Sequence, residues 1–153
     1  MGTKMAMTYD SDLAAWASEQ AALLRAGRLT ELDIENLAAE IEGVGKREVK
    51  SLRSALREAL EHLIKLQTSP TSKLQTDWKV LIAKQRIAIA DLLADSPSLR
   101  TKMPDLFKQS WAIARQFATL GEKESGDTSV IPQDNPFTLD QLLDENFFPD
   151  SLK

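Results

Sequence analysis

The chain has 153 residues, 42% of them hydrophobic and 27% charged, a balance typical of one folded domain. It contains no cysteine, which excludes a disulfide framework, a thiol nucleophile and a cysteine-ligated metal site. The net charge of −4 is unevenly distributed: residues 46–86 carry 10 basic and 4 acidic side chains, whereas residues 1–45 carry 3 basic and 8 acidic ones. Residues 87–153 are again acidic, with 6 basic and 11 acidic side chains.

The apolar segments are too short for a membrane span. The longest uninterrupted apolar run covers residues 13–17, whereas a spanning helix needs about 20 residues. The opening residues also lack the apolar region of a signal peptide. We therefore expect a cytoplasmic protein with no membrane contact, whose residues 1–8 form a disordered tail and whose residues 150–153 form a C-terminal tail.

Helical spacing of apolar residues begins near the N-terminus. The first helix is predicted to start after Asp10 or Ser11, since both residue types cap helices well. It is predicted to end before Gly27, because glycine readily takes the left-handed conformation that follows a last helical turn.

A second predicted helix is capped by Thr30 and reaches Gly43 and Gly45, where the pattern leaves two alternatives open: a stop, or a bend within one long helix. The segment 46–67 is the longest predicted helix and ends at Pro70, which cannot continue it. Its apolar residues follow heptad-like steps of three and four, as in a helical bundle: Val49, Leu52, Leu56, Ala59, Leu63 and Leu66.

The C-terminal half continues the pattern. A fourth helix is predicted from residue 71 or 72 to residue 94, followed by a short turn that Ser96 and Pro97 start. A fifth helix is predicted over residues 104–120, closed by Gly121, and a last short helix over residues 138–143. The apolar residues 147–149 are predicted to dock on the body of the protein.

These elements together predict the fold class. We expect an all-α protein, a single-domain helical bundle over residues 9–149 with about five main helices and short accessory helical turns.

Several segments, in this order and spacing, resemble the bacterial and largely cyanobacterial domain-of-unknown-function family numbered 29. They are YDSDLAAW at 9–16, LLRAGRL at 23–29, ELDIENLAAEIE at 31–42, HLIKLQ at 62–67, Trp78, SPSLR at 96–100 and NPFTL at 135–139. The resemblance spans residues 9–149 and implies a stand-alone helical protein. It implies no activity, and no catalytic or binding residue can be carried over from it.

His62 is the only histidine, and it sits mid-helix beside Glu58. Bundle metal centres use Glu-x-x-His pairs on two helices, a pattern this chain lacks, so we expect no metal site and no cofactor. We expect His62 at a helix–helix interface, bonded to a carboxylate such as that of Glu40 or Glu42. If any polar catalytic site exists, its candidates are His62, Glu40 and Glu58.

The basic segment offers a candidate binding face on one helix, formed by Arg47, Lys50, Arg53 and Arg57. A row of cations suits phosphate binding, but the isoelectric point near 5.1 and the lack of a recognition motif favour a solvated or internally paired face.

The residues therefore predict a non-catalytic protein–protein interaction module. We expect an unidentified protein as its partner, and the chain also fits a homo-oligomer. The alternative function is nucleic-acid binding through residues 46–86. An enzyme or metalloprotein centred on His62 is the third and weakest hypothesis.

Overall fold

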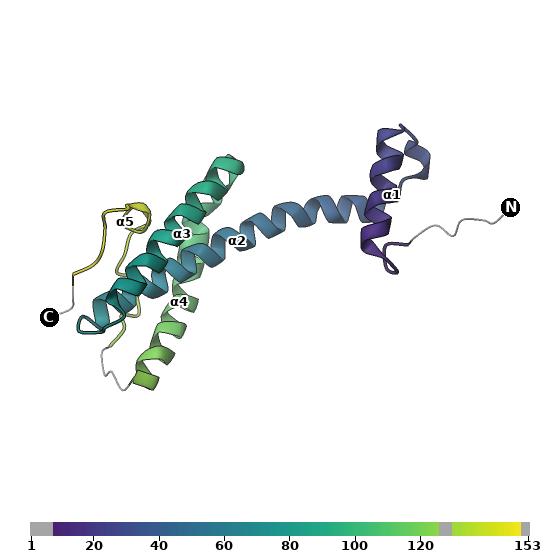
Figure 1. Cartoon of the computed structure of the whole chain (residues 1–153). Helices are drawn as coiled ribbons and strands as arrows, with labels where there is room; N and C mark the ends of the chain where they lie inside the picture. Colours follow the sequence, from purple (N-terminus) through teal and green to yellow (C-terminus); the bar gives the residue numbers. More distant parts are fainter. Residues whose placement is uncertain (1–7, 126–129, 151–153) are drawn as a thin grey trace. The chain divides into compact units, whose positions relative to one another are not determined.

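The computed structural model describes residues 8–125 and 130–150, and every regular element in these ranges is a helix (Figure 1). The all-α prediction is confirmed. The elements in chain order are α1 (Leu13–Arg25), η1 (Leu29–Glu31), α2 (Ile34–Thr68), α3 (Gln75–Asp95), η2 (Pro97–Lys102), α4 (Met103–Ser125) and α5 (Leu139–Leu143). No helix in the described parts is both long and apolar enough to cross a bilayer.

The chain divides into two compact units, Met1–Arg47 and Glu48–Lys153, which we call the first and second units. The single domain over residues 9–149 stays a prediction. The two predicted tails, residues 1–8 and 150–153, lie almost entirely outside the described residues.

Of the two alternatives at Gly43 and Gly45, the stop is wrong: α2 runs uninterrupted through both glycines. Each glycine costs a helix about 1 kcal/mol relative to alanine, which weakens the helix without ending it. Ending it with glycine would need a positive φ, and among the described residues only Gly27 has one, at 68°. The predicted end before Pro70 is confirmed.

Four predicted boundaries are wrong. The side chain that caps α1 is Asp12, whose Oδ1 accepts from Ala15 N at 2.9 Å, rather than Asp10 or Ser11. Thr30 lies in η1 and caps no α-helix; Asp33 caps α2 instead. The helix α4 continues through Gly121 to residue 125 because this glycine keeps an ordinary helical φ.

The fourth wrong boundary is the start of α3, at Gln75 rather than residue 71 or 72. Residues 71–74 form turns instead, in which Ser72 N donates to Ser69 O at 3.1 Å. The side chain of Gln75 then donates to the carbonyls of Leu66 and Ser69, at 3.2 and 2.9 Å. It thereby supplies a donor to the carbonyl of Leu66, which lies in the last turn of α2.

The second unit is built on α2, α3 and α4, which lie side by side (Figure 1). Its interior is a cluster of aliphatic and aromatic side chains, and the predicted heptad of α2 lies in it. The heptad residues Leu52, Leu56, Ala59 and Leu63 are fully buried, Leu66 is 3% exposed, and Val49 packs against the cluster.

The C-terminal segment docks on this cluster as predicted. Thr138 caps α5 in a reciprocal capping box, since its Oγ1 accepts from Gln141 N and Gln141 Oε1 accepts from Thr138 N. Phe147 and Phe148 pack against the buried cluster.

Candidate functional site

The part of the first unit that the structure describes is a hairpin of α1 and the start of α2. Asp33 joins the two helices. Its Oδ1 accepts from Asn36 N at 3.4 Å and its carbonyl accepts from Leu37 N at 2.9 Å, so Asp33 rather than Thr30 caps α2. From α1, Trp16 Nε1 donates to Asp33 Oδ2 at 3.1 Å, and Gln20 Oε1 accepts from Asp33 N at 2.8 Å. One aspartate thus fixes both the start of α2 and its contact with α1.

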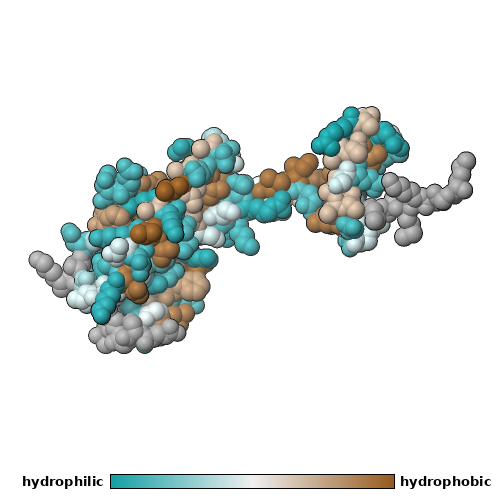
Figure 2. Space-filling view, in the orientation of Figure 1, coloured by the Kyte–Doolittle hydropathy of each residue, from teal (hydrophilic) through white to brown (hydrophobic). Residues whose placement is uncertain are grey.

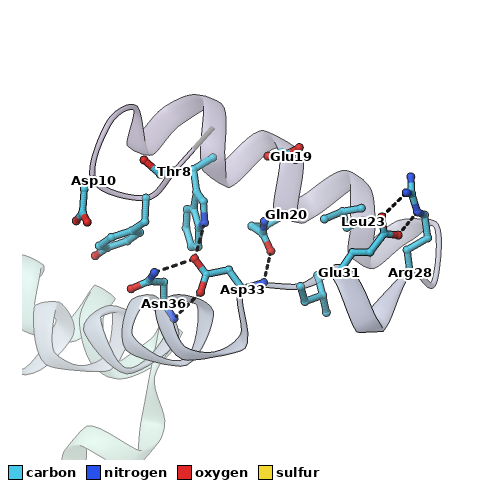
Figure 3. Close-up of a pocket in the computed structure, with 12 residues that line it drawn as sticks. Thr8, Asp10, Glu19, Gln20, Leu23, Arg28, Glu31, Asp33 and Asn36 are labelled. Carbon is cyan, nitrogen blue, oxygen red and sulfur yellow. Dashed lines mark hydrogen bonds and ion pairs between the residues drawn. The ribbon is translucent and has the colours of Figure 1, made fainter. Parts of the chain in front are cut away.

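A polar pocket of about 480 Å³ opens beside Asp33 (Figure 3). Asn36 Nδ2 donates to Asp33 Oδ2 at 2.7 Å, and this bond is the main reason that the pKa of Asp33 lies below its ordinary value. At the other end of the pocket, Arg28 and Glu31 form a two-bond ion pair. The polar groups that line the pocket are therefore largely bonded to one another.

Tyr9 closes the hairpin against both helices. Its ring meets Trp16 edge-on, with ring centroids 4.9 Å apart, and its hydroxyl donates to Glu40 Oε1 at 2.6 Å. The bond to Glu40 and the nearby negative charge raise the pKa of Tyr9. Glu40, predicted as a candidate for a polar site with His62, therefore bonds within the first unit.

An apolar groove of about 530 Å³ also opens between α1 and α2, and it shares Trp16 with the polar pocket. It is lined by Leu13, Ala14, Trp16, Ala17, Ala21 and Leu24 from α1, and by Leu37 and Glu40 from α2. Leu13 and Leu24 are 50% and 49% exposed, and on α2 Ile34 and Ile41 are 63% and 70% exposed. Figure 2 shows hydrophobic surface on both α1 and the adjoining part of α2.

The hairpin buries little of its own apolar surface. Among residues 8–47, only Trp16 and Gln20 are fully buried. Chains of this size rarely gather enough core to be stable on their own. Covering the apolar groove would therefore remove more apolar area from water than covering the polar pocket of the first unit.

The predicted basic face divides between the two units. Arg47 is exposed and belongs to the first unit, whereas Lys50, Arg53 and Arg57 belong to the second. Lys50 borders a pocket of about 500 Å³ between α2 and α3. Arg57 is partly buried, with its guanidinium 5.8 Å from the centre of the Phe117 ring.

His62 is 8% exposed, and its Nδ1 lies 2.7 Å from the carbonyl oxygen of Glu58. The predicted carboxylate partner is thus replaced by a main-chain carbonyl one turn earlier. The Glu58 carboxylate accepts from Gln85 Nε2 at 2.7 Å instead. In the parts of the chain that the structure describes, no three His, Asp or Glu side chains are grouped to hold a metal ion.

The family model described as Domain of unknown function DUF29 matches residues 8–148. The chain belongs to this family. The predicted resemblance is confirmed, and the match covers both compact units.

The structure of this DUF29 chain is similar to the crystal structure of an alpha-helical protein of unknown function from Rhodospirillum rubrum. The two share 24% sequence identity over 92% of each chain, with a TM-score of 0.66, a likeness that concerns the fold alone. A comparison with curated proteins gives no match.

Arg86, the most deeply buried cation among the described residues of this DUF29 chain, was predicted only as one of the charges of the basic segment, residues 46–86. It is 7% exposed and donates to backbone carbonyls of the C-terminal segment. Backbone carbonyls carry no sequence signal, so the arginine could not be separated from its exposed neighbours by composition.

Proposed function

We propose that this DUF29 protein is a non-catalytic, cytoplasmic protein–protein interaction module that binds its partner in the apolar groove of the first unit. The observation that carries the proposal is the exposure of the groove. Leu13 and Leu24 are half exposed although they sit beside Trp16, which is 3% exposed. A contiguous apolar surface of this kind is typical of a protein-binding site.

The groove suits one kind of partner, an amphipathic helix with basic residues beside its apolar face. Two helices with small side chains between them accept a third helix closely, and Ala14, Ala17 and Ala21 supply such a floor. The surroundings are acidic, because described residues 8–47 carry 8 acidic and 4 basic side chains. Opposite charge on the partner would speed association and fix its orientation.

The test is a pull-down with the full chain from the native organism, with and without nuclease, comparing two matched leucine variants. Leu24 in the groove is 49% exposed and Leu120 on α4 is 52% exposed, so replacing either by glutamate costs the fold little. We expect a stoichiometric protein that is captured by the wild-type chain and by Leu120→Glu but lost with Leu24→Glu. Equal capture by all three proteins would refute the groove as the binding site.

Nucleic-acid binding remains the second candidate, favoured by the placement of Lys50, Arg53 and Arg57 on one face of α2 in the second unit. It predicts retention of DNA or RNA at low salt and a steep loss of binding as salt rises. Arg53→Ala should weaken binding to every sequence about equally. Partners that disappear after nuclease treatment, in the pull-down above, would favour this candidate over the groove.

A further inference from the structure

The helix α3 carries apolar side chains on two faces. Ile82, Ile89 and Leu93 are buried in the core of the second unit. A second apolar row faces outward and is exposed along its whole length: Val80, Ala83, Ile87, Ala90 and Ala94. We call this row the outer stripe of α3. In it Val80 is 48% exposed and Ile87 63% exposed.

The outer stripe has the spacing of a helix-pairing seam. Its members follow one another by three, four, three and four residues, which are the a and d positions of a heptad. Three of the five are alanines, and small side chains allow a second helix to approach closely. A surface helix normally presents polar side chains on its outward face. An outward apolar row with this spacing is therefore a candidate surface for packing against another helix. Figure 2 shows hydrophobic surface along the part of the second unit where α3 runs.

Charges along the two edges of the stripe identify that partner. One edge carries Asp77, Lys84 and Asp91, all exposed, at the three e positions within α3. The other edge carries Lys79 and Arg86, whose cationic groups lie 5.4 and 5.2 Å from the centre of the Phe148 ring of the C-terminal segment. Lys79 is exposed and Arg86 is buried, so the C-terminal segment covers part of this second edge, and the Lys84 and Asp91 edge is the more open of the two to a neighbour.

We propose that the outer stripe of α3 binds the same stripe of a second copy of this chain, in antiparallel orientation. The register places Ile87 against Ala90 of the second copy and Ala83 against Ala94 of the second copy, each contact occurring twice about a two-fold axis. Antiparallel helices bring their e positions together, so Lys84 meets Asp91 of the second copy, again twice. The stripe is thus complementary to itself in both shape and charge.

The alternative pairings are less favourable. A parallel pair sets e positions against g positions and places Lys79 beside Lys84 of the other copy. It also brings Arg86 near Asp91, but the Arg86 donors already bond carbonyls of the C-terminal segment and do not offset the repulsion. An antiparallel pair shifted by one heptad places Lys84 against Lys84 and Asp77 against Asp91. Like charges in these places disfavour both arrangements, so the charges select one register.

The seam offers at most five residues per copy, so we expect a contact area below that of a standard interface. We therefore expect a dissociation constant on the order of micromolar rather than nanomolar. The dimer is independent of the groove in the first unit, since the two surfaces lie in different units and share no residue.

The experiment is sedimentation velocity of the full chain over a concentration series spanning the micromolar range, with helicity of every variant checked by circular dichroism. Two matched variants locate the surface, because Ile87 on the stripe and Ile34 in the first unit are the same residue type and both 63% exposed. We expect Ile87→Glu to abolish the dimer while Ile34→Glu leaves it intact. A chain that is monomeric throughout overturns the proposal, as does a dimer lost with Ile34→Glu and kept with Ile87→Glu.

A charge exchange tests the register. Lys84→Asp alone and Asp91→Lys alone each place like charges together, and each should weaken the dimer by about 3- to 10-fold. The double variant Lys84→Asp/Asp91→Lys restores both pairs and should recover the wild-type dissociation constant. Additive weakening in the double variant would overturn the antiparallel register.

The pull-down with Leu24→Glu tests the groove, whereas the sedimentation experiment tests the dimer. A negative result in one experiment therefore does not count against the other proposal.

Discussion

The guanidinium of Arg86 on α3 donates from Nε to the backbone carbonyl of Leu142 at the end of α5, across 2.7 Å. Further bonds from the same side chain reach the carbonyls of Gln141 and Phe147, at 3.2 and 2.8 Å. Burial lowers the pKa of Arg86, and the negative charge of Asp144 opposes this. A single cation therefore bonds two carbonyls in the last turn of α5 and one in the segment that follows it.

Replacing Arg86 by alanine should destabilise the second unit by about 2–4 kcal/mol, because charged donors are lost and buried carbonyls are left unpaired. Urea denaturation measures the change. Arg100→Ala is the control, since Arg100 is exposed, and we expect it to change stability by no more than about 0.5 kcal/mol. Equal stabilities of the two variants would show that the carbonyls find other donors.

Replacing each of two glycines by alanine should change the free energy of unfolding in opposite directions. Gly27 has a φ of 68° and open space around it, so Gly27→Ala should cost about 1–2 kcal/mol from backbone strain alone. Gly45 lies inside α2, also with open space, and Gly45→Ala should stabilise the helix by about 0.5–1 kcal/mol. Thermal unfolding followed by circular dichroism gives both values. A stabilising Gly27→Ala would contradict the left-handed turn.

The capping carboxylate of the hairpin should titrate below its ordinary range. Because the pKa of Asp33 is lowered on folding, its contribution to stability is present above the unfolded value near 3.8 and is lost as pH falls through the lower folded value. The indole Nε1 proton of Trp16, which donates to Asp33, reports this titration by NMR. Asp33→Asn keeps an acceptor and should remove the acid-dependent shift, whereas an unchanged titration in that variant would assign it to another carboxylate.

The hydroxyl of Tyr9 should ionise above its ordinary pKa of 10.0. A raised folded pKa means that its contribution to stability is present below 10.0 and is lost as pH rises through the folded value. Tyr9 is the only tyrosine, so ultraviolet absorbance follows it directly. Glu40→Gln removes the charge and should return the midpoint toward 10.0; no movement would mean that the bond to Glu40 is not kept in solution.

Local signals predicted much of the fold. The last short helix at Thr138, the turn at Gly27 and the end of α2 before Pro70 each depend on a few neighbouring residues, and all three are confirmed. The same reasoning failed at Gly121, because a glycine permits a left-handed turn without requiring one. Whether it turns depends on the packing of the rest of α4, which the local sequence does not contain.

The candidate surfaces were harder to predict than the helices. The groove needs α1 and α2 to be placed together, which the side chains of Asp33 and Tyr9 accomplish across intervals of 17 and 31 residues. The outer stripe of α3 did carry a local signal, since its spacing can be read directly from residues 80–94. The stripe was not predicted as a surface because the inward row of the same helix, which includes Ile82 and Ile89, accounts for a buried face by itself.

The contacts of Arg86 also mean that this side chain can be buried only after the C-terminal segment has been synthesised. The ribosome adds this arginine 56 positions before Leu142, whose carbonyl accepts one of its bonds. While the chain is emerging, α2, α3 and the first turns of α4 can assemble their apolar faces, but the guanidinium must stay hydrated until the last segment arrives. The nascent protein thus keeps a solvated cation at the place where its C-terminal segment will later close.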